Sequence, residues 1–129
     1  ATTRGKPSIT VEAGYAGTVD PEDLNLLVQG CLRVMRYLKM LPGDAPAIEH
    51  PVWIEKISAL VSEQNGIFYA LAKRGSYVQE GMKIGFVTDY HNRTIFEARA
   101  PASGVVLFIR AVPSMTKGET VANIGVVAR

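Results

Sequence analysis

The stretch Pro7-Ser8-Ile9-Thr10-Val11-Glu12-Ala13-Gly14-Tyr15 decides how the beginning of this 129-residue chain is interpreted. Ile9 to Glu12 run apolar, β-branched, β-branched and acidic, which predicts a short buried strand over 8–13 with a carboxylate at its C-terminal end. Ligands of open α/β sheets bind outside the carboxyl ends of the strands, so Glu12 is a candidate functional residue. A solvated or capping carboxylate is the alternative that this pattern leaves open.

A long helix is predicted after this strand. Asp20 can cap the helix, and Pro21 suits its first position. Apolar residues then recur at three- and four-residue spacing, which predicts an amphipathic helix over 21–40 that ends before Pro42-Gly43. Cys31 falls on the apolar side, so we expect a buried structural thiol and not a nucleophile.

Composition excludes several classes of protein. The net charge is only +2 and is scattered along the chain, which gives nucleic-acid binding no support. A single cysteine excludes an internal disulfide framework and is typical of a reducing compartment, so we expect a cytoplasmic protein. The longest apolar segment is interrupted by Arg33, Arg36 and Lys39, so no membrane partner is expected.

The predicted strand and helix cannot form a core by themselves. A strand that is apolar on both faces needs parallel neighbours on each side. We therefore expect a larger α/β domain to precede Ala1, or another chain to supply the missing strands. The exposed edge of the strand also leaves a homo-oligomer open. The expected layout is a strand–helix piece over 1–42, a proline-punctuated linker over 43–51 and a second domain over 52–129.

The second domain carries short alternating or apolar runs that are separated by turn signals. Asn65-Gly66 is typical of a hairpin turn. Many short strands at close spacing predict an antiparallel barrel or sandwich. The expected strands are residues 52–61, 67–72, 82–87, 94–98, 104–110 and 121–128.

This domain also contains an internal repeat. A glycine-led apolar strand followed by a charged residue and glycine occurs first over 66–85 and again over 104–122. Such a repeat suits two half-barrels related by a pseudo-twofold axis, and it resembles the barrel-sandwich hybrid of biotinyl and lipoyl carrier domains. Those domains attach their cofactor to a lysine at the hairpin between the halves. Arg93 occupies that position, and a guanidinium cannot be acylated in this way, so we expect no biotin or lipoate.

Taken together, the segments resemble the C-terminal part of the succinylglutamate desuccinylase/aspartoacylase family, within the zinc carboxypeptidase superfamily. The resemblance rests on four segments: Ile9-Thr10-Val11-Glu12-Ala13-Gly14, the helix end Arg33–Leu41, the strand entry Ala98–Leu107, and Lys117-Gly118-Glu119. It implies an α+β chain: the last strand and helix of an α/β zinc-hydrolase domain, followed by a small all-β barrel-sandwich domain.

The resemblance also implies a chemistry. In this family a zinc ion polarises the amide carbonyl of an N-acyl amino acid, and a glutamate acts as general base and then as acid to the leaving amine. The match assigns that role to Glu12. It also makes Arg4 a candidate for binding a carboxylate of the substrate, although a solvated arginine near a terminus is an equal alternative.

The family's zinc ligands are an H-x-x-E pair and a distant histidine, all upstream of the glutamate. This chain has only His50 and His91, which lie in different segments without metal-ligand spacing, so we expect no metal site within it. The chain alone is then inactive and needs the missing N-terminal catalytic portion. The turn Asp89-Tyr90-His91-Asn92 is a segment of the barrel that can narrow access for small substrates.

Two other classes of function remain open. The first is a non-catalytic barrel-sandwich module that binds or gates a partner. The second is a biotin- or lipoyl-type carrier, against which Arg93 argues.

Overall fold

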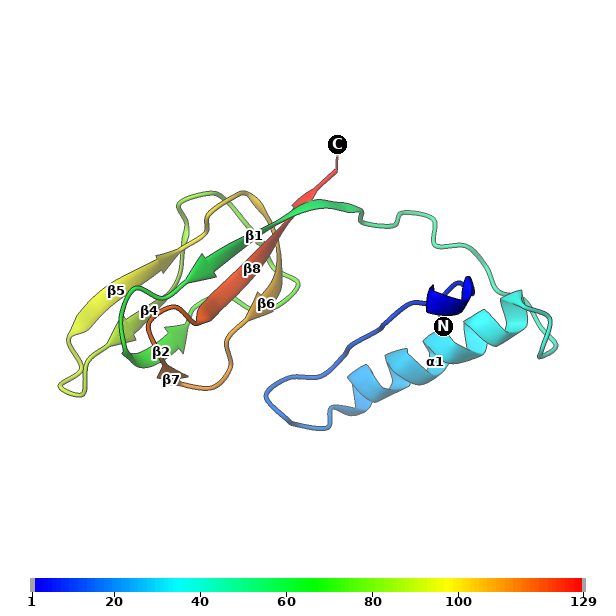
Figure 1. The fold of residues 1–129 in the computed structure, drawn as a ribbon, viewed down its shortest axis with the longest axis horizontal. Coiled ribbons are helices and arrows are strands. Elements are labelled where there is room, and N and C mark those ends of the chain that lie inside the picture. Colours follow the sequence, from blue (N-terminus) through cyan, green and yellow to red (C-terminus); the bar gives the residue numbers. More distant parts are fainter. Residues whose placement is uncertain (1, 129) are drawn as a thin grey trace. The chain divides into compact units, whose positions relative to one another are not determined.

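The computed structural model describes residues 2–128, which divide into two compact units, Ala1–Glu49 and His50–Arg129 (Figure 1). The first unit contains a short 3-10 helix, η1 (Thr2–Arg4), and the helix α1 (Pro21–Tyr37). The second unit is built from strands. Within residues 2–128, no helix is both long enough and apolar enough to cross a membrane.

Helix α1 starts where the sequence predicts and ends earlier. A side-chain oxygen of Asp20 accepts a hydrogen bond from the backbone N–H of Glu22 at 2.9 Å, which caps the first turn. The predicted end at Met40 is wrong, because Lys39 adopts a left-handed conformation with φ 61°. The N–H of Lys39 then donates to Arg36 and that of Met40 to Met35, as in a Schellman motif.

The predicted strand over 8–13 is not formed. This segment is extended, but among the described residues no neighbouring strand pairs with it. Ile9 and Val11 are consequently 79% and 63% exposed. Cys31 is exposed too, contrary to the prediction, because α1 has no buried residue. The apolar stripe predicted for this helix is therefore only partly covered, with Leu27, Leu32 and Met35 half-buried.

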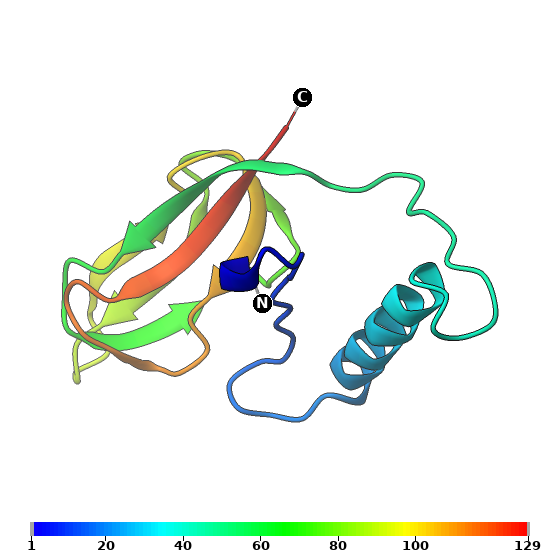
Figure 2. The same ribbon diagram turned by 45° about the vertical axis from the view of Figure 1, so that its right-hand side comes forward.

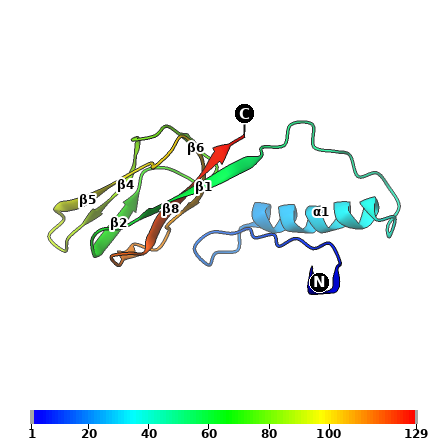
Figure 3. The ribbon, with the colours of Figure 1, turned by 45° about the horizontal axis from the view of Figure 1, so that its top comes forward.

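The second unit contains two antiparallel four-stranded sheets (Figures 1, 2 and 3). One sheet has the order β1-β8-β6-β3, and the other has the order β5-β4-β2-β7. The strands are β1 (Ile54–Val61), β2 (Gly66–Ala70), β3 (Tyr77–Val78), β4 (Lys83–Thr88), β5 (Thr94–Arg99), β6 (Gly104–Ile109), β7 (Ser114–Met115) and β8 (Thr120–Val127). Six of them match predicted strands with shifted ends, whereas β3 and β7 were not predicted because each has only two residues.

The two sheets follow the internal repeat of the sequence. The repeat relates β1 to β5, β8 to β4, β6 to β2 and β3 to β7. The strand order of the first sheet is therefore repeated in the second. Hydrogen bonds repeat in the same way. The N–H of Gly81 donates to the carbonyl of Ala100 at 2.9 Å, and the N–H of Gly118 donates to that of Ser62 at 2.8 Å. The unit is therefore internally pseudo-symmetric.

The predicted hairpin turn at Asn65-Gly66 is wrong. β1 pairs with β8 and β2 pairs with β4 and β7, so the chain passes from one sheet to the other at this point. Gly66 is required for a different reason: a Cβ atom there would lie 2.2 Å from the carbonyl oxygen of Thr88. Gly104 is its equivalent in the repeat, and a Cβ atom there would lie 2.1 Å from the carbonyl oxygen of Gly125.

A single hydrophobic core joins the two sheets. Both repeats contribute to it at equivalent positions, since Ile84 and Val87 of β4 correspond to Val121 and Ile124 of β8 and all four are fully buried. The core cluster comprises Phe68, Val78, Ile84, Val87, Ala98, Ala100, Val106, Ile109, Met115, Val121, Ala122 and Ile124.

Candidate functional site

Glu12 lies in the extended segment that precedes α1, and its side chain is exposed. Among residues 2–128 no hydrogen bond or ion pair is formed by its carboxylate. Gly14 and Gly17 follow, with positive φ angles of 124° and 72°. The chain turns between them, and Tyr15 and Thr18 form an isolated bridge before α1 begins. The carboxylate of Glu12 is thus accessible in the described part of the chain.

Arg4 ends η1 and is also exposed. Within the described part of the chain, no ion pair or hydrogen bond joins Arg4 to Glu12. Both residues belong to the first unit, but the structure does not bring their side chains into a common contact. Their predicted roles stay predictions.

The two histidines are exposed residues of irregular segments. His50 lies in a bend at the start of the second unit, and His91 lies at the tip of the β4–β5 hairpin. No group of three or more potential metal ligands occurs among residues 2–128. The described residues therefore do not provide the three protein ligands that a catalytic zinc ion requires.

The tip of the β4–β5 hairpin is held together by Asp89. Its Oδ1 accepts hydrogen bonds from the N–H groups of His91 and Arg93, each at 2.9 Å, and its Oδ2 lies 2.7 Å from an Arg93 nitrogen. The Arg93 N–H and the Arg93 guanidinium hold the pKa of Asp89 below its usual value. Tyr90, at the tip, is 89% exposed. This ordered turn presents a large aromatic side chain to its surroundings.

Arg93, the residue at the carrier-lysine position, is therefore engaged at the base of the turn. Its guanidinium is an ion-pair partner of Asp89. It lacks the primary amine that a carrier domain acylates.

A second charged group lies on β4 and β5. Lys83 Nζ and an Arg99 nitrogen each lie 2.6 Å from a carboxylate oxygen of Glu97. The Lys83 ammonium and the Arg99 guanidinium lower the pKa of Glu97. Sequence reasoning missed this group, because it depends on the register of Lys83 opposite Arg99 and of Phe86 opposite Glu97.

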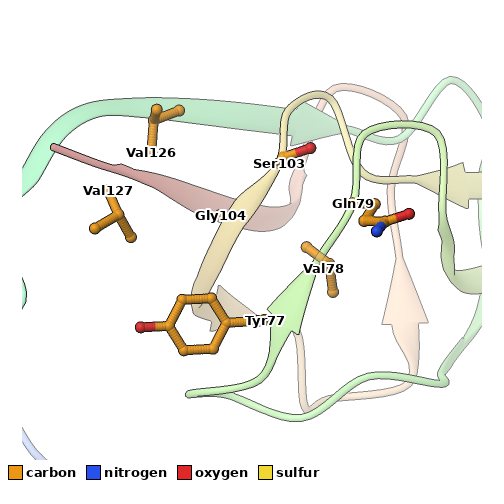
Figure 4. A pocket seen from close by; sticks show the side chains of 7 residues that line it. All are labelled: Tyr77, Val78, Gln79, Ser103, Gly104, Val126 and Val127. Carbon is orange, nitrogen blue, oxygen red and sulfur yellow. The ribbon is translucent and has the colours of Figure 1, made fainter. Parts of the chain in front are cut away.

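A pocket of about 560 Å³ lies at one end of the β1-β8-β6-β3 sheet (Figure 4). Its lining has no charged side chain and is mostly apolar, with Gln79 and Ser103 as the polar exceptions. Sequence reasoning missed the pocket because it is formed partly by β3, which was not predicted. The lining residues are Tyr77, Val78, Gln79, Ser103, Gly104, Val126 and Val127.

Comparison with solved structures gives clear matches. A succinylglutamate desuccinylase from Silicibacter sp. TM1040 is 25% identical, with a TM-score of 0.72 over 87% of this chain. A succinylglutamate desuccinylase/aspartoacylase from Rhodobacter sphaeroides is 18% identical, with a TM-score of 0.73 over 84%. The ectoine utilization protein EutE (DoeB) from Ruegeria pomeroyi is 20% identical, with a TM-score of 0.72 over 85%.

These structures confirm the predicted resemblance: the structural neighbours of this chain are members of the succinylglutamate desuccinylase/aspartoacylase family. The chain spans 35%, 36% and 35% of their respective lengths. No protein-family model and no curated protein matches the chain.

Proposed function

We propose that this chain is the C-terminal part of a hydrolase that deacylates N-acyl amino acids by cleaving their amide bond. The observation that carries the proposal is the likeness of 87% of the chain to a succinylglutamate desuccinylase, at a TM-score of 0.72. Residues 1–42, with helix α1 and the segment before it, are the terminal piece of the catalytic α/β domain, and residues 52–129 are a barrel-sandwich domain. The exposed apolar side chains of the extended segment and of α1 support this division, because they need a cover.

Glu12 is the proposed general base. Hydrolysis of an amide requires removal of a proton from the attacking water and delivery of a proton to the leaving nitrogen, and one carboxylate can perform both transfers in sequence. The exposed carboxylate of Glu12 meets the requirement of access. Arg4 is the proposed partner for a substrate carboxylate, because a guanidinium can bind a carboxylate through two parallel hydrogen bonds.

The resemblance implies zinc, but the described residues do not fit a zinc site. We therefore place the metal ligands upstream of Ala1, and no step of the reaction depends on a metal held by this chain. The substrate is a small N-acyl amino acid, and the Asp89–Asn92 turn is the proposed element that narrows access to the site. The hydrogen bonds from the backbone N–H groups of His91 and Arg93 to Asp89 order the turn that carries Tyr90, which supports that role.

The test is Glu12→Gln in the complete gene product, with Glu49→Gln, another exposed carboxylate of the first unit, as the matched control. Removing a general base costs about 10²- to 10⁴-fold in turnover, so kcat for N-acyl amino acid hydrolysis should fall by that amount while bound zinc is retained. The control should keep its activity.

Retained activity of Glu12→Gln would contradict the role assigned to this residue. A complete gene product with no zinc-ligand sequence upstream would contradict the hydrolase assignment and favour the non-catalytic binding or gating module instead.

A further inference from the structure

The outer face of the β1-β8-β6-β3 sheet is apolar. Ile57 and Val105 are both register partners of Gly125, and Tyr77 is the partner of Val105, so their side chains share one face. A Cβ atom on Gly125 would lie 2.9 Å from Leu107, which shows that Leu107 lies on this face as well. Tyr77 is 67% exposed and Ile57 is 59% exposed. We call this surface the neutral face: Ile54, Ile57, Tyr77, Val105, Leu107 and Val127.

The equivalent face of the other sheet is charged. It carries the ion-paired group Lys83, Glu97 and Arg99, together with stacked rings of Tyr69 and Phe86 whose centroids are 5.0 Å apart. Lys83 also lies over the Phe86 ring, 5.2 Å from its centroid. Charged side chains on a sheet surface are typical of a face that stays in water.

The neutral face also includes Ala59 and Val61, which lie on the same side of β1 as Ile57, and Thr120, the partner of Val61. The pseudo-symmetry makes these three residues the equivalents of the charged group. Arg99 pairs with Lys83 in one sheet as Val61 pairs with Thr120 in the other. Ala59, opposite Asn123, takes the place of Glu97, opposite Phe86. The same fold thus has an ion-paired group on one face and three uncharged side chains at the equivalent positions of the other. At these three positions the strand pairing of the two sheets is the same, so the difference between the faces lies in their side chains.

The neutral face continues into the pocket. Tyr77 belongs to both, and Val127, the register partner of Ile54, also lines the pocket (Figure 4). A charge-depleted surface beside a pocket that can receive an apolar side chain is the usual anatomy of the centre of a protein–protein contact.

We propose that the neutral face and its pocket are the docking surface for the α/β portion of the same protein that lies outside this chain. The inference rests on the proposed function. The occupant follows from length: the matched structures contain this fold as only 35–36% of their chains, so about two thirds of each is further polypeptide available to cover an apolar surface. The charged face stays in water in the assembled protein.

The test compares side-chain labelling by a photo-generated carbene in the 129-residue chain and in the complete gene product. Tyr77 and Leu107 should be labelled about tenfold less in the complete product, because the centre of a contact excludes water. Tyr69 and Phe86, on the charged face, are the internal controls and should be labelled equally in both proteins.

A pair of matched variants strengthens the test. The triple variant Ala59→Glu, Val61→Arg and Thr120→Lys copies the ion-paired group onto the neutral face, at positions where the equivalent residues are tolerated by the same fold. In the complete product it should restore most of the labelling of Tyr77. The reverse variant, Lys83→Thr, Glu97→Ala and Arg99→Val, should leave the protection of Tyr77 unchanged.

The outcomes separate this inference from the proposed function. A complete product that deacylates N-acyl amino acids but shows no protection of Tyr77, or protection of Tyr69 instead, overturns only the docking surface. Protection in an inactive product supports the docking surface and overturns the function. If Tyr77 in the 129-residue chain becomes more protected as the concentration rises, a second copy is the occupant and the inference is overturned. A gene that encodes nothing upstream of Ala1 would overturn the inference as well.

Discussion

The second unit has a closed apolar core, whereas no residue over 3–49 of the first unit is buried. Ile84, Val87 and Ile124 are fully buried between two sheets, but the longer helix of the first unit contains no buried residue. Both units have clear apolar periodicity in sequence. The comparison teaches that periodicity determines which face of an element is apolar, while the presence of a cover depends on the rest of the polypeptide.

The largest expected difference between the units is in the cost of removing an apolar side chain. Ile124→Ala should lower the free energy of unfolding of the second unit by about 2–5 kcal/mol, because it leaves a cavity in a closed core. Val34→Ala in α1 should change the measured free energy of unfolding by less than about 0.5 kcal/mol, since this side chain is exposed. Urea unfolding followed by circular dichroism measures both. An equal cost at the two positions would show that α1 is covered within this chain.

Glycine substitutions provide the next test. Gly66→Ala and Gly104→Ala should each destabilise the second unit by about 1–3 kcal/mol, because the added methyl group meets a backbone carbonyl and the strands must move apart. The two costs should agree, since the positions are equivalent in the repeat. Urea midpoints measure this, and a cost at only one site would contradict the equivalence.

The same substitution should have the opposite sign in the first unit. Gly30 lies in the middle of α1, and a Cβ atom there meets nothing within 4 Å. Gly30→Ala should therefore stabilise the helix by about 1 kcal/mol. An increase in helical signal at 222 nm, with an unchanged urea midpoint for the second unit, is the expected result. A decrease would show that the helix is packed closely at this position.

The smallest expected effect is a loss of stability in acid. The pKa of Glu97 is lowered by Lys83 and Arg99, and the pKa of Glu119 is lowered by the N–H of Thr116 and by Arg110. A carboxylate whose pKa is lowered by folding contributes stability above its usual pKa, and this contribution is lost as the pH falls through the lowered value.

The second unit should therefore unfold at lower urea concentration below about pH 4, with little change between about pH 5 and pH 7. Glu97→Gln should flatten this dependence. The same acid sensitivity in the variant would show that Glu97 does not contribute to it.

The sequence predicted much of the second unit and less of the first. Alternating apolar residues located six strands, and the repeated glycines anticipated the correspondence between the two sheets. The two-residue strands β3 and β7 could not be found in this way, because a run of two residues has no period. Asn65-Gly66 was misread as a hairpin turn, since local sequence does not distinguish a glycine required by φ from one required by the close carbonyl of Thr88.

In the first unit the helix start was predictable from Asp20 and Pro21, because capping is local. The strand over 8–13 was not, because a strand exists only through its neighbours. Of the candidate site, the positions of Glu12 and Arg4 in the sequence could be proposed, but no contact between their side chains could be derived. The pocket and the charged group of Lys83, Glu97 and Arg99 depend on strand register, which single-sequence patterns do not determine.

The pseudo-symmetry also determines where the polypeptide of the second unit could be cut and rejoined. The N–H of Ala128 donates to the carbonyl of Trp53 at 2.9 Å, and the repeat maps both residues onto His91 at the tip of the β4–β5 hairpin. The two ends of the unit therefore occupy the position that the hairpin tip occupies in the other half. The chain is continuous at the tip and interrupted at the ends. A circular permutant that links Ala128 to Trp53 and begins at His91 would keep every strand pairing, so the order of the two halves along the gene is not required by the fold.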